Sequence, residues 1–184
     1  MKYGISLFVA VILVSLAGTA VAALPVGGKA PMFTAQASLG GTVYTYSLAK
    51  ALQKGPVVVY FYPEAFTKGC TIEAHDFAEA MPKYKALGAT VIGVSRDDIE
   101  VLKKFSVSEC RSKFPVAADP DGSITRSYDA VMPILHKYAR RVSYVIAPDG
   151  TVIYEYTDLN PEHHVANTLK ALRAWDQAHG RGNG

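Results

Sequence analysis

VVVYFYPEAFTKGC, residues 57–70, is the stretch of sequence that decides the fold. Its first six residues are β-branched or aromatic, which predicts a buried strand over residues 57–62. Pro63 ends this strand because proline has no N–H to donate to a sheet ladder. A helical pattern follows from Thr71, so Cys70 is expected where a helix begins. The helix dipole and the unpaired N–H groups there favour the thiolate, which is the reactive form of cysteine.

The other elements follow from hydrophobic periodicity and from turn residues. Residues 25–41 are expected to be irregular, because Gly27-Gly28 and Gly40-Gly41 punctuate them. Further strands are expected over residues 42–46, 90–94, 114–118, 142–146 and 151–156, and helices over 48–53, 70–87, about 97–108, 124–128 and 160–175. Pro82 lies inside the longest helix and is expected to kink it. This order of elements predicts an α/β sandwich around a mixed sheet.

Residues 1–22 are predicted to be a signal peptide. They carry one charge, Lys2, followed by an apolar stretch and by Ala20-Val21-Ala22, which fits a signal-peptidase site. The alternative, an uncleaved membrane anchor, is disfavoured because the apolar core is short for a span of about 20 residues. We therefore expect export to the periplasm or beyond, with no stable membrane association after cleavage.

Cleavage would leave 184 − 22 = 162 residues, which suits one domain over residues 23–175 and a flexible tail over 176–184. Removing Lys2 lowers the net charge from +3 to +2. So small a charge gives no reason to expect a nucleic-acid or membrane partner. Two cysteines in an exported chain indicate a structural disulfide by default.

Two blocks of sequence resemble the peroxiredoxin family. Pro63, Thr67 and Cys70 match its Pro-x-x-x-Thr/Ser-x-x-Cys motif, and the flanking residues are similar to its bacterioferritin comigratory protein, or peroxiredoxin Q, branch. Residues 141–150, RVSYVIAPDG, resemble the late strand that carries the family's active-site arginine. The resemblance runs from about Leu24 to Trp175. It implies a thioredoxin-like fold with a mixed central β-sheet flanked by helices.

The resemblance assigns roles to four residues around this motif. Cys70 becomes the peroxidatic nucleophile, Thr67 a hydroxyl donor to the peroxide, and Pro63 a shield of the thiolate. Arg141 becomes the guanidinium that stabilises the thiolate and holds peroxide oxygen. Arg140 is its competitor, and only one of the two can serve because adjacent strand residues point to opposite faces. Without the resemblance, Cys70 could equally be an inert buried thiol, Thr67 a helix cap and Arg141 a surface residue.

Four further residues lie near Cys70 in the sequence. Glu73, three residues after Cys70, either orients the site through arginine and backbone hydrogen bonds or merely favours the helix dipole. Phe66 is expected to line the pocket, whereas Tyr62 and Phe77 are expected in the core.

One departure from the family pattern concerns the second thiol. Many members of this branch have a resolving cysteine five residues after the peroxidatic one, but His75 stands there. Cys110 is then the candidate resolving cysteine, with a bystander thiol or a static bridge as alternatives. Because bridged cysteines need Cα atoms within about 7 Å, we expect local unwinding at Cys70 or over residues 106–113 during turnover.

Neither a cofactor nor a metal is expected. Cys70, His75 and Cys110 lack a fourth ligand for a structural zinc site. His163 and His164 are expected to be exposed at the start of the last helix.

The resemblance implies a thiol peroxidase that reduces hydrogen peroxide and small organic hydroperoxides. A thioredoxin-like protein would restore the thiols, and the protein would be a monomer or a weak dimer. Two alternatives remain from the residues alone. A thiol–disulfide oxidoreductase would want Cys-x-x-Cys, but positions 67–70 read Thr-Lys-Gly-Cys. A non-catalytic binding module with a static Cys70–Cys110 bridge would not need Thr67 or Arg141.

Overall fold

The computed structural model describes residues 23–179, so the predicted signal peptide and the last five residues of the predicted tail lie outside it. Seven strands form one mixed sheet in the order β2-β1-β5-β4-β3-β6-β7. The strands are β1 (Thr34–Leu39), β2 (Thr42–Ser47), β3 (Val57–Phe61), β4 (Thr90–Ser95), β5 (Val116–Ala118), β6 (Val142–Ile146) and β7 (Val152–Thr157). The helices are α1 (Leu48–Leu52), α2 (Lys68–Ala86), α3 (Ile99–Ser108), α4 (Ser123–Ser127), the 3-10 turn η1 (Pro161–His163) and α5 (His164–Ala178).

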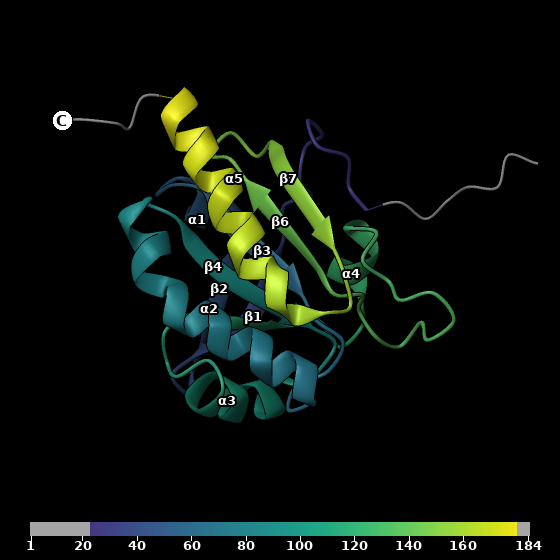
Figure 1. Cartoon of the computed structure of the whole chain (residues 1–184). Coiled ribbons are helices and arrows are strands. Elements are labelled where there is room, and N and C mark those ends of the chain that lie inside the picture. Colours follow the sequence, from purple (N-terminus) through teal and green to yellow (C-terminus); the bar gives the residue numbers. More distant parts are fainter. Residues whose placement is uncertain (1–22, 180–184) are drawn as a thin grey trace, which may run out of the picture.

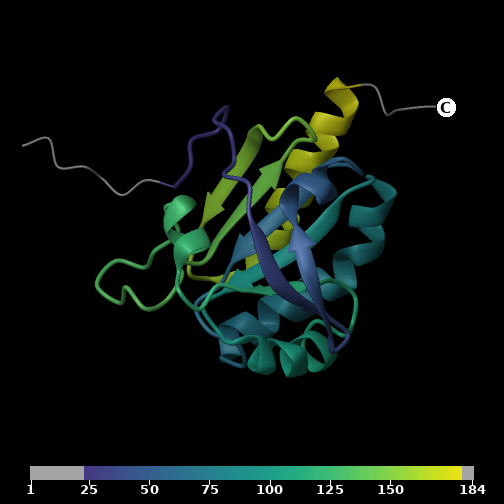
Figure 2. The same cartoon turned by 180° about the vertical axis from the view of Figure 1, so that it is seen from behind.

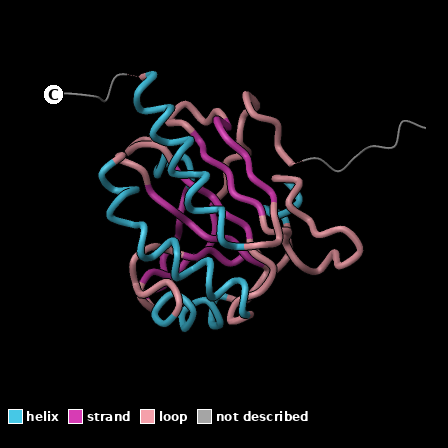
Figure 3. The backbone as a smooth tube through the Cα atoms, viewed as in Figure 1, coloured by secondary structure: helices cyan, strands magenta, loops and turns pink. Residues whose placement is uncertain are grey.

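Helices cover both faces of the sheet. Helices α2, α3 and α5 pack on one face through a cluster that includes Tyr60, Phe77 and Phe105. On the other face, α1 and α4 pack on a cluster that includes Val59 and Phe61. Figure 1 shows α2 and α5 in front of the sheet, and Figure 2 shows α1 from behind. The tube view separates these helical layers from the central strands (Figure 3). The predicted α/β architecture is therefore confirmed.

The middle of the sheet explains how distant parts of the chain meet. Strand β3 pairs with β4 in parallel and with β6 in antiparallel register, and Phe61 lies opposite Val142. The end of β3 therefore adjoins the start of β6. Cys70, which follows β3, and Arg141, which precedes β6, are brought to the same edge of the sheet.

Two expectations about the elements are corrected. Residues 34–39, expected to be irregular, form strand β1, which pairs with both β2 and β5. The last helix runs to Ala178, so residues 176–178 are helical rather than part of a tail. Helix α2 continues past Pro82, and the kink expected there stays a prediction.

Within residues 23–179, no helix has both the length and the apolar character needed to cross a bilayer.

Candidate active site

Cys70 lies in the first turn of α2, as the sequence predicts. Thr67 is the N-cap of this helix, and its carbonyl accepts the N–H of Thr71 at 2.9 Å. The Cys70 side chain is 1% exposed and its thiol is free. The sulfur therefore lies at the positive end of a 19-residue helix, within the core rather than at the surface.

Arg141 reaches Cys70 from the start of β6. Its Nη2 lies 3.4 Å from Cys70 Sγ, and its Nε donates to the Leu159 carbonyl at 2.9 Å. The Arg140 guanidinium instead donates to the Asp129 carbonyl. The predicted choice of Arg141 over Arg140 thus agrees with the geometry, since the two side chains reach different partners. Cys70 and Arg141 are 71 positions apart in the sequence.

Gly69 explains how the guanidinium comes so close to the helix. A Cβ at this position would lie 2.9 Å from Arg141 Nη2. Any side chain at position 69 would therefore displace the guanidinium from the sulfur.

Glu73 is the second partner of Arg141. Its Oε2 accepts a short hydrogen bond from Arg141 Nη1, and the carboxyl is fully buried. Burial raises the pKa of Glu73 to about 8, although Arg141 acts to lower it. Burial alone would lower the pKa of Arg141, but Glu73 and Cys70 outweigh it and the pKa is raised. The guanidinium therefore stays charged between two acidic groups, and Glu73 acts as an arginine partner rather than a surface charge.

His164 forms the layer behind Glu73, which the sequence did not predict. It was expected to be exposed with His163, but it is fully buried and only His163 is exposed. Its Nε2 donates to the Asp158 carbonyl at 3.0 Å, and its Nδ1 lies 2.8 Å from Ser143 Oγ. Burial lowers the pKa of His164 to about 4, so the ring is neutral near pH 7.

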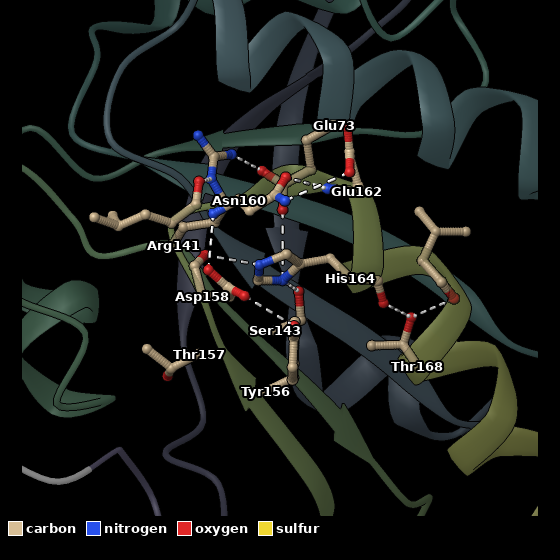
Figure 4. A network of polar contacts seen from close by, with 12 residues as sticks. Glu73, Arg141, Ser143, Tyr156, Thr157, Asp158, Asn160, Glu162, His164 and Thr168 are labelled. Carbon is tan, nitrogen blue, oxygen red and sulfur yellow. Dashed lines mark hydrogen bonds and ion pairs between the residues drawn. The ribbon is translucent and has the colours of Figure 1, made fainter.

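The neutral ring has a defined tautomer because a carbonyl only accepts hydrogen bonds. Nε2 carries the hydrogen, and Nδ1 accepts from the Ser143 hydroxyl. Nδ1 also lies 3.6 Å from Glu73 Oε1, an atom with no hydrogen-bond partner among the described residues. Figure 4 shows His164 between Ser143 and Glu73, with Arg141 beyond. Ser143 follows Arg141 by two residues on β6, and this spacing is the signal that could have placed it on the same face.

The loop before Cys70 carries the other predicted residues. The Thr67 hydroxyl donates to the Glu64 carbonyl at 3.0 Å and is exposed, and Pro63 is half-buried. Phe66 has a left-handed backbone with φ of 64° and packs edge-on against Phe105, with ring centroids 5.2 Å apart. The structure thus places these residues next to Cys70 in the chain, and their roles toward a peroxide remain predictions.

Asp97 anchors this loop, a role that the sequence analysis did not predict. Its Oδ2 accepts the Ala65 N–H at 2.9 Å and the Ser95 hydroxyl at 2.7 Å. The loop that carries the motif is therefore fastened to the end of β4.

Cys110 lies just after α3, in the core cluster that also contains Cys70. It is fully buried and its thiol is free. Burial raises the pKa of the Cys110 thiol, and the neighbouring Glu109 adds to the shift. In this conformation Cys110 is thus a protonated, unreactive thiol.

A cavity of about 350 Å³ opens beside Arg141. It is lined by Met132, Pro133, Arg140, Arg141, Thr157 and Leu159. Half of these side chains, those of Met132, Pro133 and Leu159, are apolar, so the cavity suits an uncharged organic group next to the guanidinium.

Together these groups fit nucleophilic redox chemistry by a thiolate. The arrangement supplies a buried sulfur at a helix N-terminus and a guanidinium that touches it. Among residues 23–179, no group of three or more histidine, cysteine or acidic side chains is placed to hold a metal.

Comparison with known proteins gives a consistent result. Residues 26–155 match the model of the AhpC/TSA family. A chloroplastic peroxiredoxin Q from Oryza sativa subsp. japonica is 35% identical over 149 residues, which is 80% of this chain and 66% of that protein. Peroxiredoxin Bcp from Xanthomonas campestris pv. campestris is 30% identical over 124 residues, covering 64% of this chain and 76% of the relative. The chain thus spans about two thirds of the length of the plant relative.

Solved structures resemble the fold over most of the chain. Peroxidoxin BcpB from Mycobacterium tuberculosis superposes with a TM-score of 0.73 and 28% identity, over 81% of this chain and 96% of that one. Peroxiredoxin Q from Xanthomonas campestris gives a TM-score of 0.66 at 29% identity, over 76% of this chain and 89% of that one.

Proposed function

Because this chain belongs to the AhpC/TSA family of peroxiredoxins, we propose that it is a thiol peroxidase whose nucleophile is Cys70. The observation that carries this proposal is the 3.4 Å contact between Cys70 Sγ and Arg141 Nη2. A static binding module has no need to bury a guanidinium against a free thiol. The names of the relatives, peroxiredoxin Q and peroxiredoxin Bcp, support the same activity.

The proposed first step is attack of the Cys70 thiolate on a peroxide. The sulfur bonds to one oxygen, the O–O bond breaks, and the leaving oxygen takes up a proton to become water or an alcohol. Cys70 becomes a sulfenic acid. Arg141 holds the thiolate before attack and donates to the oxygens as charge moves onto them. Pro63 limits the access of water to the sulfur.

We infer that the substrates are hydrogen peroxide and small organic hydroperoxides. The apolar cavity beside Arg141 supports room for an organic group, since Met132, Pro133 and Leu159 line it. Hydrogen peroxide needs only the contacts at Cys70.

Cys110 is proposed as the resolving thiol and a thioredoxin-like protein as the reductant. Cys110 condenses with the sulfenic acid to give a disulfide and water, and thiol–disulfide exchange then restores both thiols. Two free thiols in one core cluster support this pairing. The raised pKa of buried Cys110 implies that its segment rearranges before it reacts.

Mass spectrometry after one equivalent of hydrogen peroxide tests this function. The reduced protein is expected to form a Cys70–Cys110 disulfide within seconds. Cys110→Ser should still reduce one equivalent of peroxide and then stop at the Cys70 sulfenic acid, without turnover on a thioredoxin. If Cys70 remains a thiol in the wild type, the protein is not a peroxidase. Unchanged turnover of Cys110→Ser would instead indicate a one-cysteine mechanism.

The Thr67→Val variant tests the proposed hydroxyl donor. Its oxidation by peroxide should be about tenfold slower, because the variant loses one hydrogen bond to the developing charge. In the free protein this hydroxyl donates to Glu64, so it must turn to meet the peroxide. Stopped-flow kinetics of Cys70 oxidation measures the rate, with Thr45→Val on the exposed side of β2 as control. Equal rates in both variants would remove Thr67 from the mechanism.

Export of a monomer or weak dimer is also proposed. The export part of this proposal rests on the sequence of residues 1–22. The mass of the mature protein tests the cleavage near Ala22, and a chain that keeps Met1 contradicts it.

A further inference from the structure

Two side-chain contacts, one between histidine and glutamate and one an arginine–glutamate ion pair, fasten the turn that carries Cys110 to helix α2. Glu109 Oε2 lies 2.9 Å from His75 Nε2, and Arg111 Nη1 donates to Glu79 Oε1 at 3.0 Å. His75 and Glu79 are four residues apart and thus share one face of the helix. Their partners are the residues immediately before and after Cys110. We call these four residues, His75, Glu79, Glu109 and Arg111, the clasp.

The clasp fixes Cys110 at a distance from Cys70 along α2. His75 and Glu79 follow Cys70 by five and nine residues, and an α-helix rises about 1.5 Å per residue. The clasp therefore docks Cys110 roughly 10 Å along the helix axis from Cys70. A disulfide needs Cα atoms within about 7 Å of each other. While the clasp is closed, Cys110 stays buried and beyond bonding range.

The backbone of the same turn is strained. Arg111 and Ser112 are consecutive non-glycine residues with φ of 50° and 54°. L-residues rarely adopt this left-handed region, and they keep it only where surrounding contacts impose it. Those contacts are the clasp and the hydrogen bond from the Ser112 N–H to the Ser106 carbonyl at 2.9 Å. Opening the clasp would relieve the strain and favour rearrangement of the turn.

We propose that opening of the clasp sets the rate at which Cys110 resolves the oxidised Cys70. His75 and Glu79 are positioning residues, because they act through the segment that carries Cys110. The inference rests on the proposed function, in which Cys110 attacks the Cys70 sulfenic acid. In that step the S–O bond breaks, the S–S bond forms, and the hydroxyl leaves as water with the proton of the Cys110 thiol.

Position 75 carries a histidine of the clasp. The resemblance to the peroxiredoxin Q branch would place a short-range resolving thiol at this position. In this chain the same helix position holds the segment of the more distant thiol.

The two contacts of the clasp, His75–Glu109 and Arg111–Glu79, should differ in how strongly they slow disulfide formation. His75 and Glu109 are 36% and 18% exposed, whereas Arg111 and Glu79 are 45% and 66% exposed. Loss of an ion pair of this kind shifts an equilibrium by up to about fivefold, and less where solvent screens it. Removal of the His75–Glu109 pair should therefore have the larger effect.

The experiment follows the sulfenic acid and the disulfide separately. Reduced protein is mixed with one equivalent of hydrogen peroxide, quenched at intervals, treated with dimedone and an alkylating agent, and analysed by mass spectrometry. Glu109→Gln should form the disulfide about fivefold faster than wild type, and Glu79→Gln about twofold faster. Oxidation of Cys70 should keep its wild-type rate in both, because neither residue touches the sulfur. Glu100→Gln is the matched control, since it breaks the Lys103–Glu100 pair within α3.

Two further measurements exclude a merely structural effect. The double variant Glu79→Arg with Arg111→Glu, which exchanges the two charges and so keeps the ion pair, should form the disulfide at the wild-type rate, unlike Glu79→Gln. Amide hydrogen exchange of residues 109–113 in the reduced protein should quicken in Glu109→Gln by a factor similar to that of disulfide formation. This second readout does not depend on peroxide.

The outcomes separate the two proposals. Unchanged or slower disulfide formation in Glu109→Gln, with normal oxidation of Cys70, overturns the proposed role of the clasp and leaves the proposed peroxidase activity standing. Absence of any Cys70–Cys110 disulfide in the oxidised wild type overturns both the resolving role of Cys110 and the proposed role of the clasp.

Discussion

Replacing Arg141 with alanine is expected to slow oxidation of Cys70 by peroxide about 10²- to 10³-fold. The reason is that this guanidinium is the charged group in contact with the sulfur, and the loss of one such preorganised donor has an effect of this size. Stopped-flow kinetics under pseudo-first-order conditions measures the rate. Arg141→Lys should fall between the two proteins, because an ammonium cannot reach Cys70, Glu73 and the Leu159 carbonyl at once.

The same substitution should also destabilise the protein. Glu73, whose raised pKa of about 8 keeps it largely protonated near pH 7, would lose its hydrogen-bond partner inside the core, and leaving a buried polar group unpaired costs about 1–3 kcal/mol. The double variant Glu73→Leu with Arg141→Ala should recover much of this stability but none of the rate, because it removes both buried polar groups. Urea unfolding and stopped-flow kinetics on the same samples thus separate folding from chemistry. A double variant that reacts at the wild-type rate would mean that Arg141 has no part in the first step.

The second large effect concerns His164 and the pH dependence of stability. Its folded pKa, about 4, lies below the ordinary value of 6.5, so the native state binds fewer protons than the unfolded state between these values. Its contribution is complete above about pH 6.5 and is lost as the pH falls through 4. The shift corresponds to about 3 kcal/mol of unfolding free energy.

Urea unfolding between pH 7 and pH 4.5 measures this contribution. The wild type should lose about 2–3 kcal/mol more than His164→Gln over this range. His163→Gln, at the exposed neighbour, is the matched control and should follow the wild type. Glu73 acts in the opposite direction, since its raised pKa adds stability that is lost as the pH rises toward 8. Its contribution cancels between wild type and His163→Gln, and the double variant Glu73→Gln with His164→Gln compared with Glu73→Gln isolates the His164 contribution, because the two side chains lie 3.6 Å apart. Parallel curves for wild type and His164→Gln would refute the role of the buried ring.

The sequence predicted those parts of the site that depend on local pattern. The apolar run before Pro63 and the helical pattern after Cys70 placed the thiol at the start of α2. The resemblance of residues 141–150 to the family's late strand selected Arg141 over Arg140. The antiparallel register that brings β6 beside β3 was not visible in either segment, because it depends on the whole sheet.

The misses have a common physical cause. Strand β1, TAQASL, consists mostly of small or polar residues, and it is held by its two neighbours β2 and β5 rather than by its own pattern. His164 follows another histidine after Asn160-Pro161, which is typical of an exposed helix start. In the fold, His164 is buried. Its two hydrogen-bond partners are Ser143 on strand β6, which is distant in the sequence, and the Asp158 carbonyl, which is six residues before it. Long-range packing decided both cases.

A count of hydrogen atoms on Arg141 shows what the pocket can select. A guanidinium has five N–H groups. One from Nη1 serves Glu73, the one on Nε serves the Leu159 carbonyl, and one from Nη2 faces the Cys70 sulfur. Two N–H groups are left for an incoming molecule, and a hydroperoxide brings two oxygens. Two acidic groups, Cys70 and Glu73, already share this one cation. An uncharged substrate therefore suits the charge of the site better than an anion does.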